Sequence, residues 1–558
     1  MTHTPGTGVP DGLVFVPLGG TGEIGMNLNL YGFQGRWLMV DLGITFGNET
    51  TPGIDVMMPD PAFIEDRLDA LDGIVITHAH EDHLGAVTYL WPWIRKPVYA
   101  SPFAAAFLRV KLEEEGLQNE VPLHEIPLGS RFSVGPFDIE MIGTTHSIPE
   151  PNALAIRTAA GNVLHTADWK FDPAPQIGAA ADKEALRRLG DEGVLAMVGD
   201  STNIFAQEHS GSEGDVRAAL IEVVGRNTTG QVAVACFASN VARMESVAVA
   251  ARENGRHAVL VGRSLYRMND TARRCGYLGD LPAFLSEEEA AELPADKVLY
   301  VCTGSQGEPR AALPRIAGGS HRSVRLGEGD TVIFSSRIIP GNERSIFTMQ
   351  NRLAEAGVEI ITARDAPIHV SGHPSRPEVE EMYRLVRPRV AVPVHGESLH
   401  LREHARVAQG CGVEHTILIG DGDVLRLDAD PPRVVDQAQT GLLGLDGERL
   451  VPMSSQILRD RRRMMNNGAA TVTLVLNGKG GLVSEPIVTA RGLLDPDEDR
   501  EDLDTLIRQI RTAVNQLDRR ALDDDDTVVD RTRRAVGRFF RGSQNRRPVT
   551  DIHVVRVA

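Results

Sequence analysis

The chain has 558 residues, of which 42% are hydrophobic and 24% are charged, a composition typical of a globular protein with more than one domain. No apolar run reaches the roughly 18 residues that span a bilayer, and residues 1–11 lack the basic start and apolar core of a signal peptide. The four cysteines stand far apart, so we expect reduced thiols and a cytoplasmic protein. The net charge of −18 opposes a nucleic-acid partner on average, although bound divalent metals add positive charge locally.

One segment is strongly basic although the chain as a whole is acidic. From Arg531 to Arg547 the sequence has seven arginines and no acidic residue. Two interpretations stay open: a solvated, partly disordered arm, or a surface that faces RNA.

The first 210 residues alternate short β-like runs with glycine-rich turns, and strands are predicted at 13–18, 37–41, 73–77, 138–142 and 194–198. From about 215 to 366, helical stretches alternate with apolar runs at 231–236, 298–303 and 331–335. This alternation is typical of an α/β domain with a mainly parallel sheet.

Short strands are predicted again at 390–394 and 415–419. The segment 421–451 is rich in glycine, aspartate and proline, which indicates a connector. Beyond it we expect strands at 471–476 and 482–489, a helix at 501–518 with apolar residues near helical spacing, and an acidic turn at 523–526.

The most informative stretch is a short apolar strand that runs into His78, His80, Asp82 and His83. Two histidines two positions apart can converge on one ion at a loop tip, while Asp82 and His83 project toward a second ion. Imidazole together with carboxylate suits Zn²⁺, and also Mn²⁺ or Fe²⁺. Four ligands do not complete two sites, so the others must come from distant strand ends.

Three distant candidates each end a predicted strand: His146, Asp168 and His395. Taken alone, each is more simply interpreted as a hydrogen-bonded core or turn residue. Together with the His-x-His-x-Asp-His loop they favour a two-metal site, which needs about this many additional ligands, one of them bridging.

This set of residues resembles the metallo-β-lactamase superfamily, whose fold is a four-layer αββα sandwich. The resemblance implies that the first metal takes His78, His80 and His146, that the second takes Asp82, His83 and His395, and that Asp168 bridges both. His165 lies near the pattern but outside it, and we assign it a structural role. The superfamily includes lactamases, thioesterases, lactonases and nucleases, so the fold alone does not fix the substrate.

More than 200 residues separate Asp168 from His395. This inserted segment resembles the β-CASP domain, which marks nucleic-acid-cleaving members of the superfamily. Two further motifs of that group match here, because Asp200 follows a predicted strand and His373 stands in a Ser-Gly-His context.

Within the β-CASP group the chain resembles the ribonuclease J family, on motifs at 19–27, 52–55, 303–308 and 335–343 in this order. The fold implied is α/β: a metallo-β-lactamase αββα sandwich with an inserted β-CASP α/β domain and a small α+β C-terminal domain. The predicted parts are 1–212 and 368–428 for the two pieces of the metallo-β-lactamase domain, 213–367 for the β-CASP domain, 429–451 for a linker and 452–558 for the C-terminal domain.

The resemblance implies a metal-dependent ribonuclease of RNA decay and processing. Such an enzyme degrades single-stranded 5′-monophosphate RNA in the 5′→3′ direction and also cuts internal sites as an endonuclease. Two divalent ions are expected per chain, with Zn²⁺ favoured and Mn²⁺ as the alternative. We expect a homodimer or a tetramer, partners in an RNA-degrading assembly and no membrane partner.

For the chemistry, Asp82 is expected to orient a metal-activated hydroxide for in-line attack on phosphorus. His373, held by Asp200, is expected to protonate the leaving 3′ oxygen, and the open alternative is that His373 only hydrogen-bonds a phosphate oxygen. Arg337 is expected either to bind phosphate or to form a surface salt bridge. By resemblance, the nucleotide upstream of the cut is bound by Phe237, Ala238 and Ser239 and by His369, Val370, Ser371, Gly372 and His373.

Two other functions compete with this one. A small-molecule hydrolase, such as a thioesterase or lactonase, is disfavoured by the insertion and by Asp200 and His373. An inactive scaffold within an RNA-degrading assembly is disfavoured because all seven predicted metal ligands are present.

Overall fold

The computed structural model describes residues 12–557, and the segment 1–11, on which the signal-peptide expectation rests, lies outside the described residues. The chain divides into two compact units. The first unit combines the chain up to Thr45 with Met58–Gly441, and the second combines Phe46–Met57 with the chain from Leu442 onward. No described helix is both long and apolar enough to cross a membrane. The four cysteines are free thiols, as expected.

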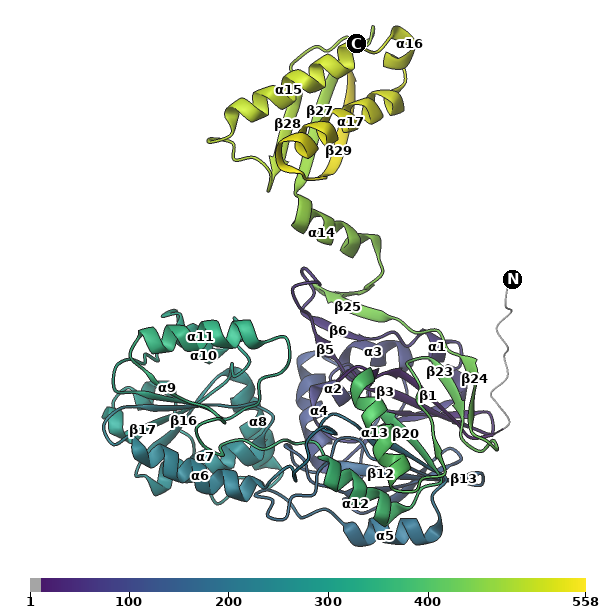
Figure 1. Cartoon of the computed structure of the whole chain (residues 1–558), viewed down its shortest axis with the longest axis vertical. Helices are drawn as coiled ribbons and strands as arrows, with labels where there is room; N and C mark the ends of the chain where they lie inside the picture. The colour runs from purple at the N-terminus through teal and green to yellow at the C-terminus, as the bar shows by residue number, and fades with distance from the viewer. Residues whose placement is uncertain (1–11, 558) are drawn as a thin grey trace. The chain divides into compact units, whose positions relative to one another are not determined.

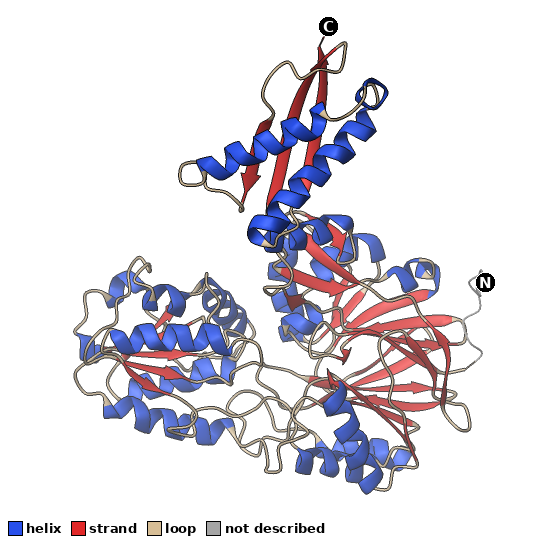
Figure 2. Cartoon of the chain, turned by 45° about the horizontal axis from the view of Figure 1, so that its top comes forward, coloured by secondary structure: helices blue, strands red, loops and turns tan. Residues whose placement is uncertain are grey.

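Two β-sheets form the centre of the first unit (Figures 1 and 2). The eight-stranded sheet has the order β24 (Arg433–Gln437), β23 (Asp423–Arg426), β1 (Val14–Gly19), β3 (Leu28–Phe33), β4 (Arg36–Val40), β7 (Leu71–Ile76), β8 (Val98–Ala100) and β9 (Leu123–Glu125). The seven-stranded sheet has the order β10 (Arg131–Val134), β11 (Phe137–Gly143), β12 (Asn152–Thr158), β13 (Gly161–His165), β14 (Ala196–Asp200), β20 (Val390–Val394) and β22 (His415–Thr416).

The main core lies between these two sheets. Phe15 and Tyr31 of the first sheet belong to one buried cluster with Ile139, Ile156 and Val392 of the second. Alternate residues of a strand share a face, so each strand gives every second side chain to this core. Each such side chain contributes roughly 1.5–3 kcal/mol when it is fully buried.

Helices cover the outer faces of the sheets. On the seven-stranded sheet, α5 (Lys183–Glu192), α12 (Arg376–Val386) and α13 (Ser398–Gly410) bury their apolar faces in a second core. On the other sheet, α4 (Pro102–Glu114) packs against β8 and β9. The two sheets and their outer helices confirm the predicted αββα sandwich.

The inserted domain has a five-stranded sheet of the order β16 (His257–Val261), β17 (Val298–Cys302), β15 (Val232–Ala235), β18 (Thr331–Phe334) and β19 (Glu359–Ile361). All four strand pairs are parallel. The main helices around it are α6 (Glu213–Arg226), α7 (Val241–Glu253), α8 (Arg263–Arg274), α10 (Ala312–Ala317) and α11 (Glu343–Glu355). The α/β prediction with a mainly parallel sheet is confirmed.

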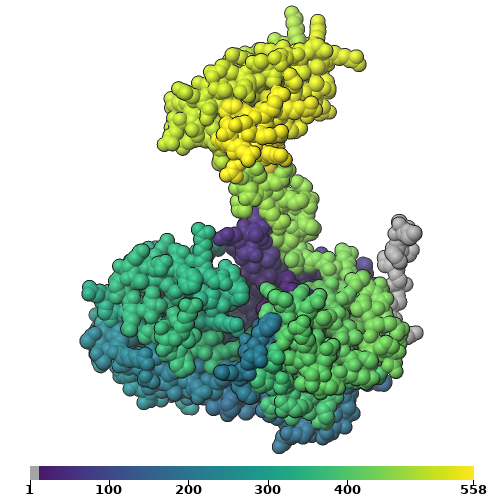
Figure 3. Space-filling view, in the orientation of Figure 1, coloured from purple at the N-terminus to yellow at the C-terminus, as the bar shows by residue number. Residues whose placement is uncertain are grey.

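The second unit, yellow in Figure 3 at its C-terminal end, contains a three-stranded sheet of the order β28 (Ile487–Arg491), β27 (Ala469–Asn477) and β29 (Val549–Val557). Every second residue of β27 is buried, from Ala470 to Leu476, against α15 (Arg500–Asn515) and α17 (Asp525–Gln544). Ahead of this sheet come β25 (Leu442–Asp446), β26 (Arg449–Pro452) and α14 (Gln456–Asn467). The predicted α+β character is confirmed.

Some local expectations differ from the structure. The segment 421–451 contains β23 to β26 rather than a bare connector, because Val424 and Leu425 of β23 are buried in the first sheet. The strand expected at 482–489 is β28, which begins at Ile487. The domain boundaries stay predictions.

Two charged segments also differ from their expected form. The acidic turn expected at 523–526 covers only 523–524, since α17 begins at Asp525, where Asp524 caps the helix and the next two aspartates favour its N-terminal dipole. Most of the basic run from Arg531 to Arg547 lies within the same helix. The interpretation as a partly disordered arm is therefore wrong.

A buried arginine of the inserted domain also binds the segment that leads back into the sandwich. Arg243 of α7 is fully buried and donates to Glu213 at the start of α6 over 2.9 Å. The same guanidinium donates to the carbonyl oxygens of Ser335, over 2.7 Å, and of Ile368, over 3.2 Å. Because Ile368 lies just before the segment 369–373, this arginine holds a predicted substrate-binding segment in place.

Arg243→Met is expected to lower the free energy of unfolding by about 3–5 kcal/mol, since it leaves the Glu213 carboxylate buried without a partner. Urea denaturation followed by circular dichroism measures this loss. The matched control is Arg252→Met on the same helix, whose partner Glu253 is half exposed, with an expected change within about 0.5 kcal/mol. Equal effects of the two substitutions would contradict the role given to Arg243.

Candidate active site

The predicted metal ligands follow strand ends of the sandwich, and two of them, Asp82 and His83, lie in the short helix α2 (Glu81–Leu84). β13, β14 and β20 are parallel neighbours, so their C-terminal ends meet at one edge of the sheet. Asp168 follows β13, Asp200 ends β14 and His395 directly follows β20. His146 follows β11, and β7 of the other sheet ends two residues before His78.

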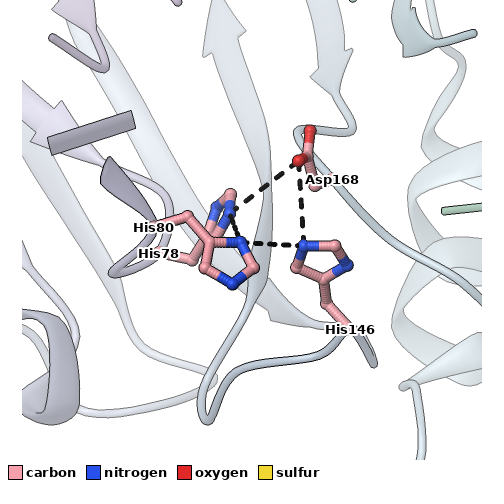
Figure 4. A group of neighbouring side chains, drawn as sticks. All are labelled: His78, His80, His146 and Asp168. Carbon is pink, nitrogen blue, oxygen red and sulfur yellow. Dashed lines mark hydrogen bonds and ion pairs between the residues drawn. The ribbon is translucent and has the colours of Figure 1, made fainter. Parts of the chain in front are cut away.

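Three histidines direct one ring nitrogen each toward a common point (Figure 4). Nδ1 of His80 lies 3.2 Å from Nε2 of His78 and 3.0 Å from Nε2 of His146. The Oδ2 atom of Asp168 lies 3.9 Å from the first of these Nε2 atoms and 3.7 Å from the second. The four side chains thus surround a space of the size that one metal ion needs.

A second group shares Asp168 with the first. Its Oδ2 atom lies 3.3 Å from Nε2 of His83, while Oδ2 of Asp82 lies 3.6 Å from that nitrogen and 3.4 Å from Nε2 of His395. The atoms of this group also lie within 4.8 Å of one another. The seven residues predicted as ligands thus lie together in the structure, with Asp168 between the two groups.

Four of the histidines have their other ring nitrogen bound to a fixed oxygen of the protein. The pairs are Nδ1 of His78 with Thr77 Oγ1 at 3.0 Å, of His83 with Asp41 Oδ2 at 2.7 Å, of His146 with the Gly372 carbonyl at 2.5 Å, and of His395 with Thr202 Oγ1 at 2.8 Å. Such partners fix the orientation and the tautomer of a ligating histidine. Each ring accordingly presents Nε2 to the cluster.

The protonation states suit metal binding. Burial and the neighbouring histidines hold the pKa of His78 and of His146 well below its ordinary value. Burial alone would raise the pKa of Asp168, but His395 and His83 hold it well below its ordinary value. Neutral imidazole and ionised carboxylate are the forms that bind metals.

The negative potential at the second group is strong. Burial would lower the pKa of His395, but Asp168 together with Asp200 and Asp82 raises it to about 10. The same balance of burial against Asp168, Asp82 and Asp41 raises the pKa of His83 well above its ordinary value. The carboxylates thus favour positive charge at this group, which a bound cation would supply in place of the two protons.

Two buried polar atoms of the cluster indicate whether its residues fit a metal ion. Oδ1 of Asp168 and Nε2 of His395 have no hydrogen-bond partner within the described part of the chain. A buried polar atom left in this state costs about 1–3 kcal/mol. A divalent cation coordinated by these atoms would remove that cost, and the set of imidazoles and carboxylates is one that such cations accept. The residues present therefore fit a divalent-metal site.

The segment that carries Asp82 and His83, which forms the short helix α2 in the structure, is held by backbone hydrogen bonds. The N–H of Asn27 donates to the Asp82 carbonyl over 2.8 Å, and the N–H of Leu42 donates to the His83 carbonyl over 2.7 Å. Gly43 allows this close approach, since a Cβ atom there would lie 1.8 Å from the Asp82 carbonyl oxygen. The glycine-rich motif at 19–27 thus ends on the residue that anchors the metal loop.

Three residues at the site have a strained backbone. Asp41, Ala167 and His395 adopt left-handed conformations, with φ of +63°, +49° and +49°. Such conformations cost about 1–3 kcal/mol each and persist only where the surroundings determine them. Each of the three lies at or next to a side chain of the cluster.

His373 and Asp200 form a pair beside the metal groups. Nδ1 of His373 lies 2.8 Å from Oδ2 of Asp200 and 3.8 Å from Oδ2 of Asp168. Burial lowers the pKa of His373, but the Asp200 and Asp168 carboxylates outweigh burial and raise it. With Nδ1 bound to Asp200, Nε2 is the ring atom left to exchange a proton with a substrate.

One predicted substrate-binding segment leads into the helix of Arg243, and the other follows a carbonyl that this arginine binds. Phe237, Ala238 and Ser239 are partly exposed just before α7, the helix that carries this arginine. Gly372 packs against His146, and a Cβ atom added to it would lie 2.7 Å from the imidazole ring. The segment 369–373 is therefore positioned by the metal cluster as well as by Arg243.

Arg337 does not form the surface salt bridge that was one of its two expected roles. Its guanidinium donates to the Asn203 side-chain oxygen over 3.1 Å, and the described residues place no carboxylate within ion-pair distance of it. His165, expected to be structural, is buried and hydrogen-bonds the Tyr31 hydroxyl over 3.0 Å.

The residues that orient the predicted ligands were not predicted from the sequence. Asp41 is fully buried and accepts from the backbone N–H of Thr77, over 2.8 Å, as well as binding His83. Thr202 binds His395, and behind it Ser201 and Tyr383 hold the two ring nitrogens of His404, each over 2.8 Å. The one available signal was a charged residue, Asp41, at the end of a strand otherwise apolar from residue 37.

Asp41→Asn is expected to weaken divalent-metal affinity by about 10–100-fold, because it weakens the acceptor that orients His83. Titration of the metal-free protein against a competing chelating dye measures this affinity. Asp138→Asn, which removes a surface carboxylate paired with Arg131, is the control and is expected to leave affinity unchanged. Wild-type affinity in Asp41→Asn would show that this carboxylate does not tune the site.

Family models match most of the chain. They are described as "Beta-lactamase superfamily domain" over residues 49–186, "Ribonuclease J, beta-CASP domain" over 229–353, "Zn-dependent metallo-hydrolase RNA specificity domain" over 341–418 and "Ribonuclease J C-terminal domain" over 456–557. The matches agree with the sandwich, the insertion and the α+β domain described above.

Relatives match over nearly the full length. The chain is 42% identical to ribonuclease J of Sinorhizobium meliloti, with 98% of this chain and 97% of the relative covered. It is 36% identical to ribonuclease J of Mycolicibacterium smegmatis, with 98% of each covered, and 31% identical to ribonuclease J2 of Bacillus subtilis, with 96% and 97% covered. Together with the assembled His and Asp cluster, these matches show that the chain belongs to the ribonuclease J family of metallo-β-lactamase-fold ribonucleases.

Proposed function

We propose that the protein degrades 5′-monophosphate RNA as a 5′→3′ exonuclease and also cuts internal sites as an endonuclease, in RNA decay and processing. The observation that carries the proposal is the convergence of two ligand groups on Asp168, with the His373–Asp200 pair beside them. A small-molecule hydrolase would need neither the pair nor the inserted domain.

The seven residues His78, His80, Asp82, His83, His146, Asp168 and His395 are proposed to hold two divalent ions, with Asp168 common to both. Zn²⁺ is favoured by the number of imidazoles, and Mn²⁺ is the alternative. When bound, the ions supply Lewis-acid activation of water and neutralise charge on the phosphate. Asp82 contributes its carboxylate at the second group, where it also orients the attacking water.

His373 is proposed as the general acid. Its Nδ1–H donates to Asp200, so Nε2 carries the proton that passes to the leaving 3′ oxygen. Asp200 is buried and ionised: burial alone would raise its pKa, but His373 holds it below its ordinary value. The carboxylate therefore favours the charged imidazolium before transfer and keeps the ring from rotating.

The nucleotide upstream of the cut is proposed to lie between the segments 237–239 and 369–373. Backbone N–H groups at a helix start and in a glycine-containing turn suit phosphate oxygens. His369 adds a buried Nδ1 atom without a hydrogen-bond partner in the described chain. Such a pocket near the metals would place a terminal 5′-monophosphate at a fixed distance from the cut. A cytoplasmic homodimer or tetramer that contacts an RNA-degrading assembly completes the proposal.

The assay compares one RNA with a 5′-monophosphate, a 5′-hydroxyl or a 5′-triphosphate end, with Zn²⁺ or Mn²⁺. Mononucleotides are expected from the monophosphate form alone, and chelation of the metal is expected to abolish them. An Asp82→Ala, His83→Ala variant serves as the inactive control. Internal fragments from all three RNAs would make the enzyme chiefly an endonuclease, and no cleavage with either metal would contradict the proposal.

His373→Gln is expected to lower kcat by about 10²–10⁴-fold while RNA affinity stays close to that of the wild type. A substrate whose leaving 3′ oxygen is replaced by sulfur distinguishes a proton donor from a phosphate ligand, since a thiolate leaves without protonation. The variant should lose little activity on that substrate. His257→Gln, an exposed histidine of β16, is the matched control. An equal loss on both substrates would leave His373 as a phosphate ligand only.

A further inference from the structure

A groove lined by arginines lies within the second unit. Its volume is about 550 Å³, and it is formed by α14, α17 and the start of β29. The arginines are Arg463 of α14, Arg533, Arg534, Arg538 and Arg541 of α17, and Arg547 just before β29. Among the described residues that line the groove, Asp530 alone is acidic.

The arginines of α17 are on its outer side because the other side is apolar. Val528, Val536 and Phe540 are fully buried against the sheet. Residues three or four positions apart share a helix face, so those from Arg533 to Arg541 form one stripe about 12 Å long, at ~1.5 Å per residue. The stripe is exposed along its whole length.

Most of this positive charge is unpaired. Arg534 pairs with Asp530 over 2.6 Å, and Arg463 pairs with Asp460 over 3.7 Å. For the four others that line the groove, the described residues place no carboxylate within ion-pair distance. Unpaired like charges along one helix repel one another, so a bound polyanion would relieve a cost that the free protein carries.

We propose that this groove binds the sugar–phosphate backbone of single-stranded RNA, as a second RNA contact separate from the metal cluster. This inference rests on RNA being the substrate. Guanidinium groups bind phosphate oxygens in a bidentate way, and a stripe of them suits a linear chain of phosphates. No aromatic side chain is among the described residues that line the groove, so base stacking is absent and binding is expected to be independent of sequence.

The test measures RNA affinity apart from cleavage. The full-length protein is kept in chelator, and its binding to a labelled single-stranded RNA is followed by fluorescence anisotropy at several salt concentrations. The groove variant carries Arg533→Gln, Arg534→Gln, Arg538→Gln and Arg541→Gln. The control carries the same charge change on other exposed faces of the unit, at Arg491→Gln, Arg508→Gln, Arg519→Gln and Arg520→Gln.

The groove variant is expected to bind RNA at least about tenfold more weakly at low salt, and its slope of log K against log salt is expected to fall by about 3, at roughly 0.7 per phosphate contact. The control should keep nearly the wild-type slope. A fourfold Arg→Lys variant, which keeps the charge, should retain most of the affinity and the slope. Melting temperatures show whether each variant is folded.

Equal weakening in the groove variant and the control would overturn the proposal, since net charge alone would explain it. The proposal would also be overturned if the groove variant bound RNA as the control does but light scattering showed that it no longer forms the wild-type oligomer. The groove would then be an interface between copies of the chain. If the wild type cleaves RNA and the groove variant binds RNA normally, the groove proposal fails and the proposed function stands. If the wild-type protein neither binds nor cleaves RNA, both the groove proposal and the proposed function are wrong.

Discussion

The structure depends on holding ionised carboxylates inside a β-sandwich. Asp168 is buried between two groups of histidines, and its ionised form exists there only because positive charge surrounds it. The ligands follow four strand ends, β7 in one sheet and β11, β13 and β20 in the other, so the two sheets must keep their positions for the cluster to exist. The left-handed backbone at Asp41 and His395 is strained, and the surrounding structure stabilises it in the conformation that directs these side chains to the cluster.

The residues that orient the histidines also depend on the relative positions of the strands. Asp41 holds His83 from the first sheet and Thr202 holds His395 from the second, so each sheet positions both a predicted ligand and its partner. Gly372 joins the inserted domain's return segment to His146. A displacement of the inserted domain would therefore be transmitted to the metal cluster through one carbonyl, and Arg243 limits that displacement from the other side.

The predicted ligands and the sandwich followed from sequence because their signals are local or end a strand. His78 to His83 are neighbours in the chain, and His146, Asp168 and His395 each follow an apolar run. Asp41 and Thr202 were missed because their roles depend on which distant strand lies beside them, and spacing along one chain does not contain that information. β23 and β24 were missed because a short strand among glycines and prolines has the composition of a turn. The helix in the basic run was not predicted, although Val536 and Phe540 stand at helical spacing, because arginine-rich segments are also typical of disordered arms.

The net charge of −18 first argued against an RNA partner, yet the charge that matters is local. At physiological ionic strength exposed charges are screened beyond about 8 Å, so distant acidic surfaces have little effect inside a groove lined by arginines or at a metal cluster. The acidic remainder of the surface has a different consequence, because it repels RNA from faces that have no site. An acidic chain whose RNA-binding charge is confined to the proposed groove and to a metal-loaded cluster would therefore hold RNA at few places and release it readily elsewhere.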